Sequence, residues 1–191
     1  MNERTSFAAF EEQPYRITAD EFLALTSHPP LNDVVGKLEL VDGVIVHVSP
    51  ALHPHSRYQS ETFFRLRTAF GDETADGWVV RVELTVRLGD HTTRDPDITV
   101  LRNPGDKKGF GASDDVLMLV EIAYTTLKTD LTHKRLNYAK AGVPYYWVVD
   151  VEGRDVHIMT TPSQGDYQDT RVFAFGSDIP VPETDKCISL D

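Results

Sequence analysis

The feature that most constrains this sequence is an apolar run from Val116 to Tyr124 that carries a single charge, Glu121. A continuous apolar run of this kind is typical of a central strand covered on both faces. It is far too short to cross a bilayer. An ionised carboxylate inside a buried strand is costly unless it is paired or bound to a metal. Glu121 is therefore either a functional acid or a structural acid that is protonated or held in a salt bridge.

The patterns around this run predict a sheet with helices packed on it. Apolar stripes predict helices, and alternation of apolar and polar residues predicts a half-buried strand over 80–88. The order of the elements indicates an α/β fold, with a mixed β-sheet core flanked by helices. The predicted helices cover 19–25, 54–70 and 129–141, and the other predicted strands cover 97–101, 145–151 and 155–160, with weaker strand signals over 171–175.

A second strong local signal is Asp42-Gly43, which predicts a hairpin between strands 37–41 and 44–49. With a two-residue turn, Val41 faces Val44 and Glu39 faces Val46. Glu39 would then share a face with several valines, which places a carboxylate on an apolar surface. The neighbouring valines are Val41, Val44, Val46 and Val48.

Length and composition fit one domain over residues 15–191, preceded by a flexible arm over residues 1–14. The single cysteine, Cys187, excludes an internal disulfide and suits a cytoplasmic location. The sequence shows neither a membrane-spanning segment nor a signal peptide, so we expect no membrane partner. The net charge of -11 argues against broad, non-specific binding of nucleic acid, which requires a basic surface.

Asp97 follows Arg94-Asp95-Pro96 at the beginning of a predicted strand. By itself, Pro-Asp is a common turn dipeptide. Together, Asp97 and Glu121 on adjacent strands would supply the carboxylate oxygens that Mg²⁺ prefers, with water completing the coordination. A main-chain carbonyl such as that of Ile122 would add a further oxygen. The pair predicts a divalent metal site that takes Mg²⁺, with Mn²⁺ as the alternative.

The helix predicted over 129–141 carries Lys134 on its inward face. Leu127, Leu131, Tyr138 and Ala141 form the apolar stripe of that helix, and Lys134 falls within it. A lysine that faces a sheet needs a carboxylate or an anion, whereas a lysine at the rim reaches solvent along its apolar stem. Asp130, one turn earlier, is placed to orient Lys134.

Two further residues are candidates for supporting roles. His55 and Gln59 extend the apolar stripe of the second predicted helix, so His55 faces inwards, where a lone histidine is usually structural. Glu39 is either a third acid of the site or a buried structural acid.

These residues belong to segments that resemble a known family. The chain resembles the Uma-two family of restriction endonucleases, a branch of the PD-(D/E)xK nuclease superfamily, over nearly its whole length from Tyr15. The segments that carry the resemblance are Leu38-Glu39-Leu40-Val41-Asp42-Gly43, Ser49-Pro50 with His55, Pro96-Asp97-Ile98, Leu119-Val120-Glu121-Ile122, Asp130 with Lys134 and Tyr138, and Ala141-Gly142-Val143-Pro144-Tyr145-Tyr146-Trp147-Val148-Val149-Asp150.

The resemblance implies metal-dependent hydrolysis of a phosphodiester, most naturally in DNA. Asp97 and Glu121 would be the metal ligands and Lys134 the catalytic lysine. The superfamily pattern has a lysine two positions after the second acid, where this chain has Ala123. The sequence also has Tyr124-Thr125-Thr126 where the family usually has Ser-Pro-Ser.

Three functions remain compatible with the sequence. The first is a DNA endonuclease, and the second is a degenerate nuclease-fold module that acts by binding or dimerisation. The third is a metal-dependent hydrolase of RNA or of a small phosphoester. Leu136 and the aromatic segment Tyr145 to Trp147 offer apolar surface, which predicts a homodimer.

Overall fold

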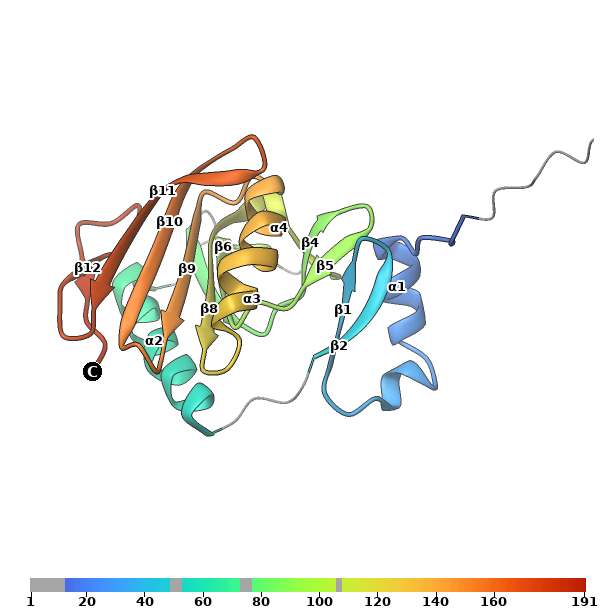
Figure 1. The fold of residues 1–191 in the computed structure, drawn as a ribbon, viewed down its shortest axis with the longest axis horizontal. Helices are drawn as coiled ribbons and strands as arrows, with labels where there is room; N and C mark the ends of the chain where they lie inside the picture. Colours follow the sequence, from blue (N-terminus) through green and yellow to red (C-terminus); the bar gives the residue numbers. More distant parts are fainter. Residues whose placement is uncertain (1–12, 49–52, 73–76, 106–107) are drawn as a thin grey trace, which may run out of the picture.

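The computed structural model describes residues 13–48, 53–72, 77–105 and 108–191. It contains a six-stranded sheet, a five-stranded sheet and helices packed on both, so it confirms the mixed α/β prediction (Figure 1). Most of the predicted N-terminal arm and the segment Ser49-Pro50 lie outside the described residues.

The six-stranded sheet has the order β11-β10-β9-β8-β6-β3. Its neighbours are antiparallel except for β8 and β9, which are parallel. Every residue of β8 is buried, as the apolar run predicted. The strands are β3 (Trp78–Val82), β6 (Ile98–Arg102), β8 (Val116–Ala123), β9 (Tyr145–Asp150), β10 (Asp155–Ser163) and β11 (Asp166–Ala174).

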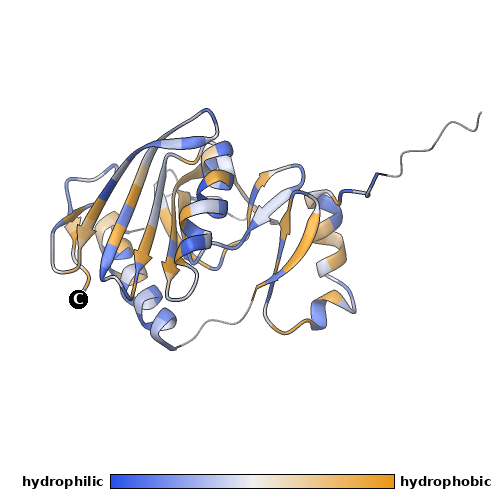
Figure 2. Ribbon diagram, viewed as in Figure 1, coloured by the Kyte–Doolittle hydropathy of each residue, from blue (hydrophilic) through white to orange (hydrophobic). Residues whose placement is uncertain are grey.

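Helices cover both faces of this sheet, and apolar colouring runs along its central strands (Figure 2). On one face, Tyr58 and Leu66 of α2 (His53–Phe70) pack with Ile98 and Val120. On the other face, Tyr138 packs with Leu119 and Val148. A two-stranded pair near the C-terminus, β12 (Ile179–Pro180) with β13 (Cys187–Ile188), closes the α2 side.

The smaller sheet has the order β2-β1-β5-β4-β7 and is covered by α1 (Ala19–Thr26). Thr18 and Glu21 form the capping box that begins α1. Two short 3-10 helices lie elsewhere in the chain. η1 (Leu31–Asp33) follows α1 in the sequence, and η2 (Ser113–Asp115) directly precedes β8. The strands are β1 (Lys37–Val41), β2 (Val44–Val48), β4 (Val86–Gly89), β5 (Thr92–Arg94) and β7 (Gly111–Ala112).

The first hairpin has the predicted register, because Val41 pairs with Val44 and Glu39 pairs with Val46. Its apolar face, however, is the opposite one. Leu40 is fully buried and packs with Phe22 of α1, whereas Val44 is 48% exposed. Glu39 therefore lies on the less apolar face, and its burial has another cause.

The segment predicted as one strand over 80–88 is two strands. Glu83 adopts a positive φ of 52° and separates β3 from β4. The two halves join different sheets, since β3 pairs with β6 and β4 pairs with β5 and β7. β5 itself was not predicted, and β11 is longer than the weak signals over 171–175 indicated.

The third predicted helix contains a wider turn in its middle. Its parts are α3 (Leu127–Thr129), a π-helical turn (Asp130–Lys134) and α4 (Arg135–Lys140). In the π turn the Arg135 N–H donates to the Asp130 carbonyl, five residues earlier. The helix ends before Gly142, whose φ is +77°.

The aromatic segment that was predicted to offer dimer surface is largely internal. Tyr146 and Trp147 are 0% and 1% exposed, so they belong to the core of the described chain. Leu136 is 39% exposed on α4. No helix in the described part of the chain is both long enough and apolar enough to span a membrane.

Candidate active site

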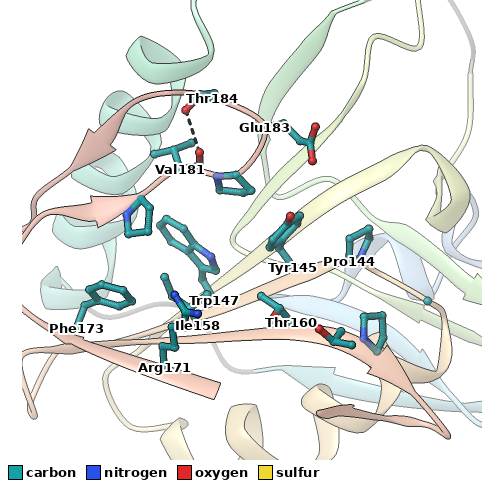
Figure 3. Close-up of a pocket in the computed structure, with 15 residues that line it drawn as sticks. Pro144, Tyr145, Trp147, Ile158, Thr160, Arg171, Phe173, Val181, Glu183 and Thr184 are labelled. Carbon is teal, nitrogen blue, oxygen red and sulfur yellow. Dashed lines mark hydrogen bonds between the residues drawn. The ribbon is translucent and has the colours of Figure 1, made fainter. Parts of the chain in front are cut away.

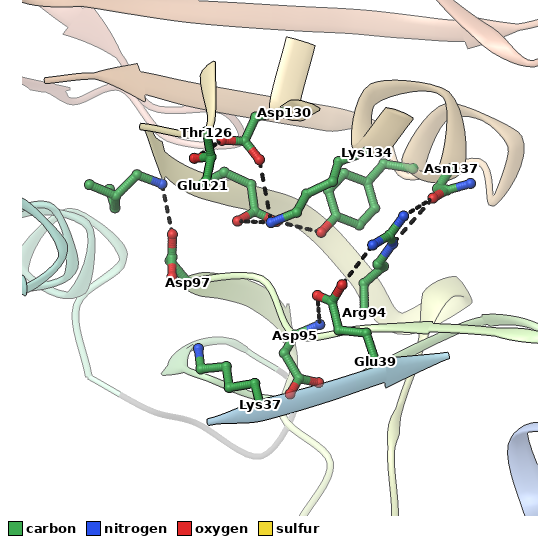
Figure 4. Close-up of polar contacts among 12 residues, drawn as sticks. Lys37, Glu39, Arg94, Asp95, Asp97, Glu121, Thr126, Asp130, Lys134 and Asn137 are labelled. Atoms are coloured by element: carbon green, nitrogen blue, oxygen red, sulfur yellow. Dashed lines mark hydrogen bonds and ion pairs between the residues drawn. The ribbon is translucent and has the colours of Figure 1, made fainter. Parts of the chain in front are cut away.

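The two predicted acids lie at the same end of two adjacent strands. Ile98 of β6 pairs with Val120 of β8, so the next residues outward in this antiparallel register are Asp97 and Glu121. Residues opposite each other in such a register share a face of the sheet. Asp97 and Glu121 are only 6% and 2% exposed. The Ile122 N–H donates to Asp97 Oδ2 at 2.8 Å, which ties the two strand ends together (Figure 4).

Lys134 reaches this pair from the π turn. Its Nζ lies 2.8 Å from Glu121 Oε2 and 3.4 Å from Asp130 Oδ1. The Tyr138 hydroxyl donates to the other Glu121 oxygen at 2.5 Å. The inward position predicted for Lys134 is therefore present in the structure, with Nζ in contact with the carboxylates of both Glu121 and Asp130.

Burial and neighbouring charges shift the pKa values of these groups in different directions. Burial raises the pKa of the Glu121 carboxyl to about 8, and the Lys134 charge offsets this only in part. Burial also acts to raise the pKa of Asp97, but hydrogen bonding and charge from His55 and the Ile122 amide outweigh it, so the Asp97 pKa is lowered. Burial acts to lower the pKa of Lys134, and the charges of Glu121 and Asp130 outweigh it and raise that pKa.

The N-terminal part of α2 supports Asp97 from the opposite side. His55 Nε2 lies 2.9 Å from Asp97 Oδ2, and Gln59 Nε2 donates to the Asp97 carbonyl at 3.1 Å. Both side chains face inwards, as predicted. His55 Nδ1 is buried and has no hydrogen-bond partner among the described residues.

Glu39 contacts a group of residues that the sequence did not single out. Arg94 Nη1 donates to Glu39 Oε2 at 2.6 Å, and Arg94 Nη2 donates to Asn137 Oδ1 at 2.7 Å. The Asp95 N–H donates to the second Glu39 oxygen at 3.1 Å. Arg94 thus links β1 of the smaller sheet to α4, the helix that packs on the larger sheet (Figure 4). The sequence feature that could have pointed to Arg94 is its position three residues before Asp97, in a region where a buried acid needs a cation.

Comparison with known proteins identifies the family. The model of the Uma2 family, described as "Putative restriction endonuclease", matches residues 19–188. The chain belongs to the Uma2 family. No curated protein matches this sequence.

A solved structure similar to this Uma2 chain is described as a "putative nuclease" from Anabaena variabilis. The two chains are 24% identical, and the match covers 87% of this chain and 89% of the other, with a TM-score of 0.64. The similarity shows that the fold is shared.

The donor set of the candidate site fits a small, hard cation. Mg²⁺ is commonly bound through one or two carboxylates, with water and substrate oxygens as the remaining ligands. Asp97 and Glu121 supply two carboxylates, and the structure holds no group of three acidic, histidine or cysteine side chains with metal-site geometry among its described residues. Both Glu121 oxygens are already hydrogen-bonded, to Lys134 and Tyr138.

A cleft of about 630 Å³ lies away from these acids, on the sheet face formed by β9, β10 and β11 (Figure 3). Its walls include Tyr145, Arg171 and Phe173, together with the C-terminal loop around Glu183. Neither Asp97 nor Glu121 lines it. The candidate site is therefore identified by its buried acids and the lysine that contacts them, and not by the presence of a large cleft.

Proposed function

We propose that this Uma2 protein is a metal-dependent phosphodiesterase that acts as a DNA endonuclease. Asp97 and Glu121 would hold Mg²⁺ or Mn²⁺, and Lys134 would be the catalytic lysine. The observation that carries the proposal is the contact of Lys134 with Glu121, at the strand end where Asp97 is also held. Membership of the family supports nuclease function.

Each residue of the candidate site would have a separate role in the reaction. Bound at the two carboxylates, the metal would lower the pKa of a water and offset charge on the phosphate. Lys134 keeps its positive charge because acids surround it, so it would stabilise the negative charge that develops on the phosphate. Asp130 would orient Lys134, and His55 would hold the Asp97 carboxylate in place.

A specific observation also favours a second candidate, a nuclease-fold module that acts by binding alone. Lys134 and Tyr138 already satisfy both Glu121 oxygens within the chain. A closed ion pair of this kind is also what an inactive descendant of a nuclease would keep for stability. The two candidates differ in whether divalent metal binds at Asp97 and Glu121.

Metal titration and cleavage assays test the proposal together. Wild type, Asp97→Asn and Lys134→Met are mixed with supercoiled plasmid and with single-stranded DNA, in Mg²⁺, Mn²⁺ or chelator. Asp114→Asn and Lys128→Met are matched controls, because both positions are exposed and Lys128 lies on the same helix as Lys134.

The nuclease proposal requires metal-dependent cleavage by wild type and by both controls. Asp97→Asn should lose metal binding and cleavage, whereas Lys134→Met should retain metal binding and lose cleavage. If calorimetry detects no metal binding to wild type, and wild type cleaves neither substrate, the result would favour the binding module. Cleavage that survives Asp97→Asn would place the catalytic centre elsewhere.

A further inference from the structure

The outer strand of the six-stranded sheet, β11, has an open edge. β11 is the terminal strand in the sheet order, and among the described residues its only strand neighbour is β10 (Figure 1). Residues 168–172 are all exposed. In the part of the chain that the structure describes, no backbone hydrogen bond joins these five residues to anything outside β10. An exposed strand edge is a template for pairing with another strand.

The sequence of this edge is complementary to itself. Residues 168–172 read Gln-Asp-Thr-Arg-Val, with Asp169 and Arg171 on either side of Thr170. In an antiparallel pair of two copies centred on Thr170, Asp169 of each copy lies opposite Arg171 of the other. Thr170 then lies opposite itself. Opposite charges and threonine pairs across antiparallel strands are both stabilising.

Within one chain, the charged side chains of this edge have few partners among the described residues. Arg171 makes no hydrogen bond or ion pair with any other described residue, and its side chain stands at the wall of the cleft in Figure 3. Asp169 uses its Oδ2 atom to accept a hydrogen bond from the Thr161 hydroxyl at 2.8 Å. A carboxylate supplied opposite Arg171 would provide the ion pair that this guanidinium lacks among the residues that the structure describes.

We propose that two copies of this chain pair through β11, antiparallel and centred on Thr170, to form one continuous sheet across a two-fold axis. Such a contact uses the same surface on both copies, as expected for a symmetric dimer. The charges also select the register. A shift that places Asp169 opposite Asp169, or Arg171 opposite Arg171, brings like charges together, which is destabilising. This interface differs from the Leu136 surface, and it does not depend on nuclease activity.

Charge exchange tests the register. Sedimentation equilibrium over a range of concentrations is measured for wild type, Asp169→Arg, Arg171→Asp and the variant with both changes. Each single change places like charges opposite each other at two symmetric positions, and should weaken association about tenfold or more. The double change restores opposite charges and should restore association. Glu152→Arg, in the exposed turn before β10, is the control and should associate as wild type.

A disulfide across the two-fold axis tests the geometry separately, and captures a weak dimer. The exposed Cys187 is first replaced by serine. Thr170→Cys then places two cysteines about 4.5 to 5.5 Å apart between Cα atoms, within the range that a disulfide spans. Val172→Cys is the control on the same strand face, because the symmetric register separates its two copies by about 13 Å along the strands.

The expected result is a covalent dimer of the Thr170→Cys variant under mild oxidation, with little or none from the Val172→Cys variant. Circular dichroism and thermal melts establish that every variant is folded. Equal cross-linking by the two cysteine variants would overturn the proposed register. A wild-type chain that stays monomeric at all concentrations, together with no cross-link at Thr170, would overturn the interface itself.

Discussion

Replacement of Glu121 by glutamine separates a metal-binding acid from a structural one. The glutamine carbonyl can accept from Lys134, as Glu121 Oε2 does at 2.8 Å. The glutamine amide can donate to the Tyr138 hydroxyl, which acts as donor or acceptor. Lys134 keeps a carboxylate partner in Asp130, 3.4 Å away. The change therefore removes a titrating carboxyl and preserves the shape of the site.

The magnitude of the effect follows from the raised pKa of Glu121, which is about 8 in the folded protein against 4.5 ordinarily. The stability that such a group contributes is fully present below the lower of these values, and is lost as the pH rises through the higher one. Wild type should lose about 3 kcal/mol through this group between about pH 6 and about pH 9. Glu121→Gln should lose none through this position, so its relative stability should increase with pH.

The assay is urea unfolding of wild type and Glu121→Gln at several pH values, with and without Mg²⁺ or Mn²⁺. Comparison of the two proteins cancels the contributions of all other titrating groups. At a metal concentration about 100 times the dissociation constant, wild type should gain about 2.7 kcal/mol and the variant nothing. Asp114→Asn, an exposed acid, is the control for the loss of one carboxylate.

Two results would refute the reasoning. A stability difference that stays constant with pH would mean that folding does not raise the pKa of Glu121. A variant less stable than wild type by about 3 kcal/mol or more at every pH, with wild type indifferent to metal, would make Glu121 a structural salt-bridge partner. The nuclease proposal should then be abandoned.

Three further substitutions probe the surroundings of the site by chemical denaturation. Arg94→Met should destabilise the fold by about 3 to 5 kcal/mol, because it leaves the Glu39 carboxylate buried without its cation; an effect near zero would show that Glu39 reaches solvent. Tyr138→Phe should cost about 1 to 3 kcal/mol, since one buried Glu121 oxygen loses its donor; an unchanged midpoint would contradict that contact. Gly43→Ala should cost about 1 to 3 kcal/mol, because φ at this turn residue is +75°; a stability equal to wild type would argue against the turn geometry.

Local patterns predicted those parts of the fold that depend on neighbouring residues. Asp42-Gly43 specified the hairpin and its register because a two-residue turn leaves one pairing. The apolar run of β8 predicted a strand covered on both faces, and every one of its residues is buried. The phase of one helix predicted that Lys134 points inwards, and it contacts Glu121.

The errors arose where distant segments decide the structure. Alternation continues across Glu83, whose positive φ separates two strands that join different sheets. The face of the first hairpin was assigned from its valines, whereas α1 covers Leu40 instead. Arg94 was not recognised as the partner of Glu39, because the two residues are 55 positions apart. Sequence periodicity carries no information about which segment will pack on a given face.

The π turn at Asp130–Lys134 also limits how the length of this chain can vary. A π turn holds more residues than an ordinary helical turn, so it is equivalent to an insertion that the helix has retained. Deletion of one residue there would convert the wide turn into an ordinary α-helical turn and leave the helix on either side in phase. Tyr138 and Asn137 would then still face Glu121 and Arg94, whereas the turn that carries Asp130 and Lys134 would be reshaped. Among natural relatives, loss of one residue at this turn should therefore preserve the Tyr138 contact and disrupt the contact between Asp130 and Lys134.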